Sequence, residues 1–176
     1  MKQEKWDEAL AAYRAAVEED PKMSAAWYGI GRVEMEKNGG KTCEAVYGPF
    51  KRCLQLDPNN PGAHYGLGDV LYVRKDYPRA EEHLRAANRL DPNLELAHQG
   101  LAVVLQQRGD LDEAIRETLA YVRLSGDPDG SGKAFAAELR AAKKFGRAAK
   151  PDAEAQARSP PPLVAPAPRP RVTSYD

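Results

Sequence analysis

The sequence predicts an all-α solenoid in which helix–turn–helix units stack one after another. One observation is an Asp-Pro pair that ends three similar segments, at Pro21, Pro58 and Pro92. The second is the spacing of these prolines, since 92 − 58 = 34 and 58 − 21 = 37, the same period with three extra residues. The third is a pattern of apolar and small residues with helical spacing on both sides of each proline.

The helix that precedes each proline carries the same three core positions. Steps of four and then three residues place each set on one helix face, and a last step of five leads to the proline. The three sets are Ala9, Tyr13 and Ala16, then Val46, Phe50 and Cys53, then Ala80, Leu84 and Ala87. Because proline cannot continue a helix, each unit is expected to end there.

The helix that follows each proline carries a second shared pattern. Its sets are Trp27, Ile30 and Gly31, then His64, Leu67 and Gly68, then His98, Leu101 and Ala102. The small residue that ends each set is expected where the two helices of a unit cross, because a larger side chain would push them apart. Short turns then lead to the next helix, at 75–77 and 109–111.

These motifs resemble the tetratricopeptide repeat (TPR) family, whose units are helix–turn–helix pairs of about 34 residues. The resemblance covers residues 1–124 and implies a right-handed solenoid of about three and a half repeats. The expected units are a half repeat at 1–22 and repeats at 23–60, 61–94 and 95–128, the last with a long exit loop. Since Met1 falls where a first helix should be ending, we expect either a fragment or an open N-terminal edge.

The second unit departs from the pattern in two places. Its period is three residues longer than that of the next unit, and the extra residues fall within 38–42. In addition, Gly48-Pro49 falls inside its second helix. Because an interior proline removes a backbone hydrogen bond, a kink or a late start of that helix is expected.

Two further segments follow the repeats. Residues 129–149 predict a helix with Phe135, Leu139, Ala142 and Phe145 on one face, without the repeat signature. We expect it to cap the last repeat, with a target-binding amphipathic helix as the alternative. Residues 150–176 are rich in proline and alanine and are expected to be an extended or disordered tail, since they bury too little surface to fold.

Composition narrows the functional class. Lys plus Arg equals Asp plus Glu at 26 each, so no basic excess indicates nucleic-acid binding. The sequence contains no apolar run long enough to span a membrane. Two cysteines do not make a disulfide framework, so a reducing, cytoplasmic location is expected.

Catalytic, cofactor and metal sites are not expected. Residues 126–134 look like a phosphate-binding loop, but Asp127 and Ala134 break its spacing. His64 and His98 share the slot of Trp27 and are expected to pack, while His83 is expected on an outward face. Cys53 is expected to be a buried structural thiol, and Cys43 an accessible one.

The TPR resemblance implies that the first helix of each unit lines a concave groove. Nine residues are expected to contact a partner there, namely Tyr28, Arg32, Met35, Tyr65, Asp69, Tyr72, Gln99, Val103 and Gln106. The positions that hold Asn in members that grip a C-terminal carboxylate are Gly29, Gly66 and Gly100, so that mode is not expected. Tyrosines and amides instead favour an extended or helical peptide with an apolar anchor.

The sequence therefore predicts a non-catalytic protein–protein interaction module or assembly adaptor. One alternative is a regulatory or substrate-selecting arm of a larger enzyme. The other is a structural protein that self-assembles into a homo-oligomer through an open edge formed by Trp6, Leu10 and Tyr13.

Overall fold

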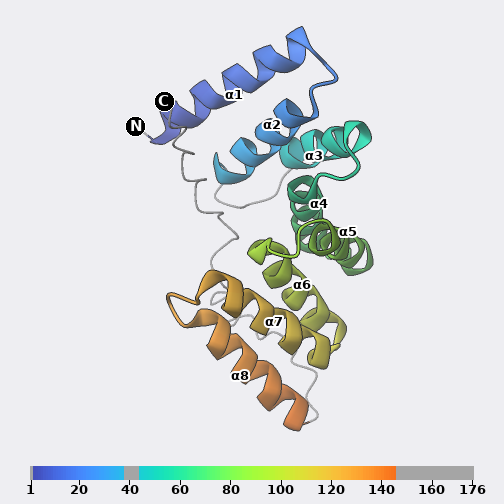
Figure 1. The fold of residues 1–176 in the computed structure, drawn as a ribbon, viewed down its shortest axis with the longest axis vertical. Coiled ribbons are helices and arrows are strands. Elements are labelled where there is room, and N and C mark those ends of the chain that lie inside the picture. The colour runs from blue at the N-terminus through green and yellow to red at the C-terminus, as the bar shows by residue number, and fades with distance from the viewer. Residues whose placement is uncertain (1, 38–43, 146–176) are drawn as a thin grey trace, which may run out of the picture.

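The computed structural model describes residues 2–37 and 44–145, and this part of the chain contains eight helices and no strand (Figure 1). The helices are α1 Lys2–Glu19, α2 Ser24–Lys37, α3 Glu44–Leu56, α4 Pro61–Val73, α5 Tyr77–Leu90, α6 Glu95–Arg108, α7 Leu111–Ser125 and α8 Ser131–Lys144. The insertion, Cys43 and the Pro/Ala-rich tail lie outside the described residues.

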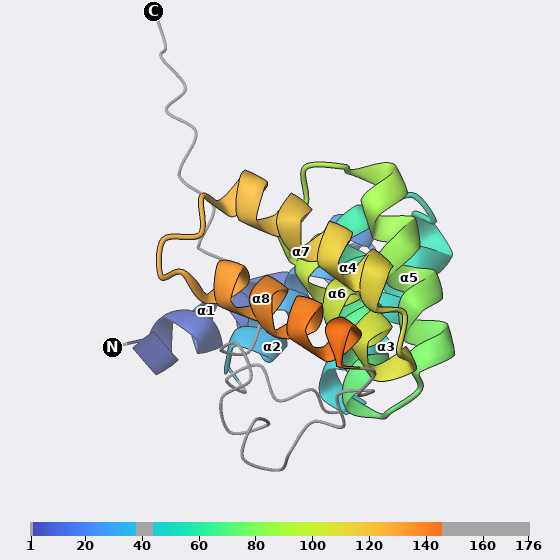
Figure 2. The same cartoon turned by 90° about the horizontal axis from the view of Figure 1, so that it is seen from below.

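Each helix packs on the next one in the chain, and the helices follow an arc from α1 to α8 in Figure 1. Helices α2, α4 and α6, here called the first helices, also contact one another in that order. The view along the long axis shows the helix pairs stacked behind one another (Figure 2). The predicted all-α solenoid is confirmed.

The three Asp-Pro turns are closed by one repeated set of hydrogen bonds. In each turn the aspartate Oδ1 accepts from the main-chain N–H two residues later, at 2.9 Å for Asp20, 3.1 Å for Asp57 and 2.9 Å for Asp91. A ring nitrogen of the following helix reaches back to the proline carbonyl. The pairs are Trp27 Nε1 to Pro21 at 3.0 Å, His64 Nε2 to Pro58 at 3.0 Å and His98 Nε2 to Pro92 at 3.1 Å.

The histidines are therefore part of the framework. The Nδ1 atoms of His64 and His83 lie 3.0 Å apart, which places half-buried His83 against α4 and corrects its expected outward position. His64 Nε2 donates to the Pro58 carbonyl, and the two facing Nδ1 atoms of His64 and His83 share one hydrogen bond. His98 Nδ1 lies 2.7 Å from an oxygen of Glu117 on α7.

The second unit is packed around Phe50, which is 1% exposed. A Cβ added at Gly31 would lie 2.7 Å from the Phe50 ring, and one added at Gly66 would lie 2.3 Å from it. Glycine at these two positions lets α2 and α4 close on the ring from α3. Helix α3 begins at Glu44 and continues through Pro49, so the expected late start of that helix is wrong.

Two buried residues of helix α8 keep the repeat spacing, although no repeat signature is predicted there from the sequence. Ala136 is 1% exposed and follows Ala102 at the repeat spacing (136 − 102 = 34). Leu139 is 0% exposed and follows Leu105 at the same spacing (139 − 105 = 34). These residues bury the face of α8 that packs on α7. The helix ends at Lys144, and Phe145 is 71% exposed, so Phe145 is not part of the packed face.

The N-terminus of α8 is capped by Asp127. This side chain is buried, and its two oxygens accept from the main-chain N–H of Gly132 at 2.8 Å and of Lys133 at 3.2 Å. The loop that resembled a phosphate site therefore holds its own carboxylate at the positive end of the helix.

Candidate functional site

Seven of the nine predicted groove residues are half-buried on the first helices, and an eighth, Tyr65, is buried beside them. We call them the first-helix face: Tyr28, Arg32, Tyr65, Asp69, Tyr72, Gln99, Val103 and Gln106. They are aligned by the repeat, since Arg32, Asp69 and Val103 occupy one slot, with 69 − 32 = 37 and 103 − 69 = 34. Contacts of α2 with α4 and of α4 with α6 bring the three sets together.

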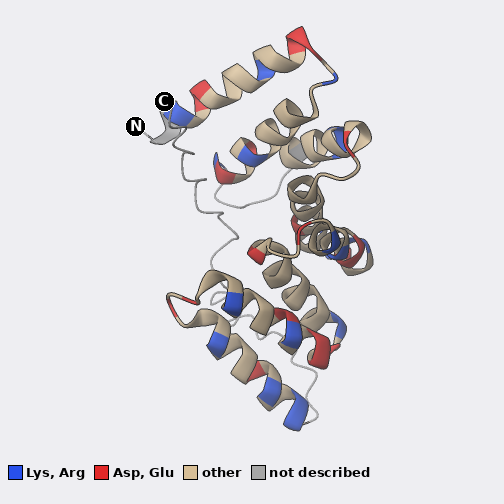
Figure 3. Cartoon of the chain, in the orientation of Figure 1, with Lys and Arg blue, Asp and Glu red and all other residues tan. Residues whose placement is uncertain are grey.

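The α4 and α6 parts of the face carry little charge, whereas α2 carries Arg32, Glu34, Glu36 and Lys37. Asp69 is the single charged residue of α4, and the charges of α6 are Glu95 and Arg108 at its two ends. The neighbouring helix α5 instead carries Arg79, Glu81, Glu82, Arg85 and Arg89. Figure 3 shows this difference as largely uncoloured ribbons for α4 and α6 beside coloured ones for α5 and α7.

Arg32 is already engaged within the chain. Its guanidinium donates to Glu36 at 3.0 Å and lies 5.9 Å from the centre of the Tyr28 ring. Tyr28 extends from α2 to α4, because a Cβ added at Gly62 would lie 2.4 Å from its hydroxyl. Burial raises the pKa of Tyr28, and Arg32 opposes that rise.

Tyr65 and Asp69 lie one turn apart on α4 and form the centre of the face. Tyr65 is 7% exposed and belongs to the core, while Asp69 is half-buried. Burial raises the pKa of Asp69 to about 7. Burial also raises the pKa of Tyr65, with a further rise from the nearby Asp69 charge, so the two groups interact. Tyr72 completes the row, with its ring centre 6.0 Å from that of Tyr77.

Met35 does not belong to the face. Its side chain is 8% exposed and packs in the core with Val46 and Phe50 of α3, whereas Tyr65, equally buried, interacts with Asp69 of the face, so the prediction of Met35 as a groove residue is corrected. The helical period places Met35 on the same side as Tyr28, but the following helix α3 covers it. Position on a helix face thus does not fix exposure.

The predicted self-assembly edge is also partly buried. Leu10 is 4% exposed in α1, which packs on α2, so Leu10 does not offer a free apolar surface. Trp6 is half-buried, and Tyr13 is 38% exposed with its ring against Gly29. Only part of the edge remains accessible.

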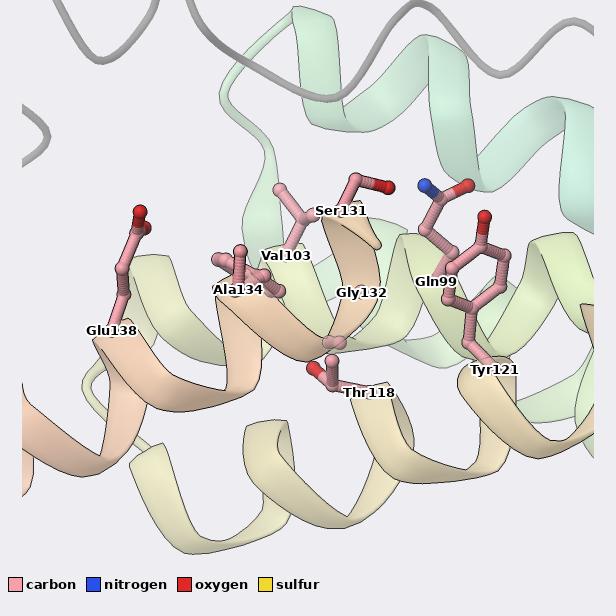
Figure 4. A pocket seen from close by; sticks show the side chains of 10 residues that line it. Gln99, Val103, Thr118, Tyr121, Ser131, Gly132, Ala134 and Glu138 are labelled. Carbon is pink, nitrogen blue, oxygen red and sulfur yellow. The ribbon is translucent and has the colours of Figure 1, made fainter. Parts of the chain in front are cut away.

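A cleft of about 170 Å³ adjoins the face between α6, α7 and α8 (Figure 4). Its walls include Gln99 and Val103 of the first-helix face, Thr118 and Tyr121 of α7, and Phe135 and Glu138 of α8. In Figure 4, Gln99 and Tyr121 lie at one end and Glu138 at the other. Sequence reasoning missed the α7 and α8 residues, although the repeat register of α8 was a signal for them.

Cys53 is 0% exposed, and burial raises the pKa of its thiol to about 11, as expected of a structural cysteine. Within residues 2–37 and 44–145, no group of three or more His, Cys, Asp or Glu is arranged to hold a metal ion. In the same part of the chain, none of the helices is both long and apolar enough to cross a membrane.

The fold and the shared face define a helical-repeat solenoid. Two family models, both described as tetratricopeptide repeat, match residues 1–61 and 50–97 and together span more than half of the chain. The chain belongs to the tetratricopeptide repeat family, whose members mediate protein–protein interactions.

A curated relative and two solved structures extend this comparison. A peroxisomal targeting signal receptor from Komagataella phaffii is 35% identical over 76 residues, which are 43% of this chain and 12% of the receptor. YrrB, described as a TPR protein with an unusual peptide-binding site, is 27% identical with a TM-score of 0.64, over 80% of this chain and 71% of YrrB. An O-GlcNAc transferase from Thermobaculum terrenum is 26% identical with a TM-score of 0.56, over 65% of this chain and 22% of the enzyme.

Proposed function

We propose that the chain is a non-catalytic interaction module, an assembly adaptor, that binds a segment of a partner protein on the first-helix face. One observation carries the proposal. Three first helices align aromatic, apolar and amide side chains on a face whose charged members are Arg32 and Asp69, and this face continues into an open cleft. Such groups offer contact area and hydrogen bonds to an extended backbone.

The relatives support the proposal in general terms. One is a receptor for a peroxisomal targeting signal, and YrrB is described with a peptide-binding site. The chain spans about an eighth of that receptor, so the identity of its partner is not taken from it.

The test is a pull-down from source lysate, read by mass spectrometry. We expect Tyr72→Ala with Gln99→Arg to lose a partner that the wild type retains, because both side chains belong to the face and neither is fully buried. The matched control is Glu82→Lys with Arg89→Glu on the exposed side of α5. Circular dichroism must show equal helicity. Retention of every partner by the face variant would refute the proposal.

A second candidate is a regulatory or substrate-selecting arm of a larger enzyme. The observation in its favour is that 65% of this chain superimposes on 22% of the O-GlcNAc transferase. The sequence of the complete gene product distinguishes the two candidates, since an arm requires a catalytic domain in the same chain. Self-assembly is less well supported, because Leu10 is already buried.

A further inference from the structure

Asp69 is a charged group without an ion-pair partner in the described part of the chain. The ion pairs among these residues include Arg32 with Glu36, 3.0 Å apart, but none that involves Asp69. Its carboxylate is half-buried, and burial raises its pKa to about 7. A carboxylate that is partly removed from water costs free energy unless a cation compensates it. A ligand that brought a cation would recover that cost.

The cation of the first-helix face, Arg32, is already paired with Glu36. On α4 its neighbours are Tyr65 and Tyr72, whose pKa values are raised first by burial and further by the Asp69 charge. On α2, Tyr28 and Arg32 act on Tyr65, whereas the pKa of Asp69 is raised by burial. The corresponding residues of α6 are uncharged: Gln99, Val103 and Gln106. Tyrosine rings beside a carboxylate favour the side chain of lysine or arginine.

The α6 residue that is equivalent to Asp69 in the repeat lines the cleft. Val103 follows Asp69 at the repeat spacing and lines the cleft with Phe135 of α8. At about 170 Å³ the cleft is smaller than the roughly 300 Å³ at which small-molecule pockets begin. It therefore fits one apolar side chain, with Gln99 and Glu138 at its ends to meet the backbone beside it.

The distance between Asp69 and the α6–α8 cleft sets how far apart the two ligand side chains that reach them must lie in the ligand sequence. Helices that pack side by side have axes about 8–10 Å apart, and an extended chain advances about 3.3 Å per residue. Adjacent slots on α4 and α6 therefore correspond to about three residues of an extended peptide.

We propose that the first-helix face binds an extended protein segment with a lysine or arginine at Asp69 and an apolar side chain about three residues away in the α6–α8 cleft. This inference rests on the proposed function, because it assumes that a partner segment binds the face. The proposal excludes acidic segments as ligands, since they would place like charge against Asp69.

The first experiment selects random dodecapeptides on phage against the immobilised full chain. We expect enrichment of a basic residue about three positions from Leu, Ile or Phe, in either order. Selection against Asp69→Asn should keep the apolar residue and lose the basic one, and selection against Val103→Asp should lose the apolar one. Glu82→Gln on the exposed side of α5 is the control that should select the same peptides as the wild type.

The second experiment measures affinities of one selected peptide by fluorescence anisotropy. Asp69→Asn should weaken binding about tenfold, or about 1.4 kcal/mol, but should not weaken binding of the same peptide with its basic residue replaced by glutamine. Wild-type binding of the basic peptide should strengthen from about pH 6 to about pH 8, across the Asp69 pKa of about 7, because the carboxylate then ionises. Asp69→Asn should abolish this dependence.

The outcomes separate the two proposals. Failure to enrich any peptide would refute both. Enriched peptides that depend on Val103 but show no preference for a basic residue, or an affinity unchanged by Asp69→Asn, would overturn this inference and leave the proposed function standing. Circular dichroism and thermal unfolding of each variant show that it is folded before it is compared.

Discussion

The ring nitrogen Nε2 of His64 lies 3.0 Å from the main-chain oxygen of Pro58, six residues before it. Trp27 makes the same contact with Pro21, also at 3.0 Å, and His98 makes it with Pro92 at 3.1 Å. A donor at this position ties the start of each first helix to the turn before it. Each repeat unit thus has this hydrogen bond to the proline carbonyl, although tryptophan makes it in one unit and histidine in the other two.

We predict that His64→Phe lowers the free energy of unfolding by about 1–3 kcal/mol, the net value of the two hydrogen bonds that the ring makes, to Pro58 and to His83. His64→Trp should lose less, although its side chain is larger, because Trp27 shows that an indole N–H makes the same bond. Urea denaturation measures both changes. If Phe and Trp proved equally destabilising, side-chain volume rather than the bond to Pro58 would explain the effect.

We predict that Gly66→Ala destabilises the chain by about 1–3 kcal/mol, the cost of overpacking a well-packed core. The added Cβ would lie 2.3 Å from the Phe50 ring, so the ring or α4 must move. Gly48→Ala is the matched control, because it lies in helix α3 with nothing within 4 Å of the new Cβ. That variant should change stability little, because the gain in helix propensity is offset by the restriction that Pro49 places on the residue before it. Thermal unfolding compares the two, and equal effects would contradict the packing argument.

We predict that Asp69→Asn is more stable than the wild type at about pH 8 and that the difference shrinks toward about pH 4. In the folded chain the pKa of Asp69 is about 7. In the unfolded chain it is about 3.9. The folded state therefore binds the proton more tightly, and stability from this group falls as pH rises through that range.

Asparagine cannot ionise, so the variant does not lose this part of its stability as the pH rises. Urea denaturation at several pH values measures the difference, with Glu82→Gln as an exposed control. A stability difference between Asp69→Asn and the wild type that stays constant with pH would show that the carboxylate is solvated as well in the folded chain as in the unfolded one.

We predict that Asp127→Gly loosens α8 and that Asp127→Asn does so less. Asp127 has a φ of 49°, so glycine removes the backbone strain together with both hydrogen bonds, whereas asparagine keeps one acceptor. Loss of an N-terminal cap costs about 1 kcal/mol.

Hydrogen exchange of peptides from 131–144 should show faster exchange in α8, with little change in α4 and α5, because repeats contact mainly their neighbours. Unchanged protection of α8 in Asp127→Gly would mean that packing on α7 alone holds this helix.

Much of the candidate site could be predicted from the residues alone. The spacing of Tyr28, Tyr65 and Gln99 identified equivalent positions on successive helices, and the structure places them on α2, α4 and α6 as expected. The cleft was not predicted, because its walls come from α6, α7 and α8 and depend on how closely those helices approach.

The sequence by itself determined the repeat and the face to which each helical residue belongs. The regular repeat spacing puts the same residue types at the same helical positions, and local geometry follows directly from spacing. This is why the fold, the Asp-Pro turns and the small residues at Gly31 and Gly68 could be predicted.

Only the tertiary structure decided what each face meets. Met35 and Leu10 are buried by neighbouring helices, and Asp69 has a raised pKa because surrounding helices exclude water from it. The burial of Ala136 and Leu139 in α8 likewise depends on packing against α7. Burial and electrostatics are sums over neighbours that are distant in the chain, so periodicity along the sequence does not contain them.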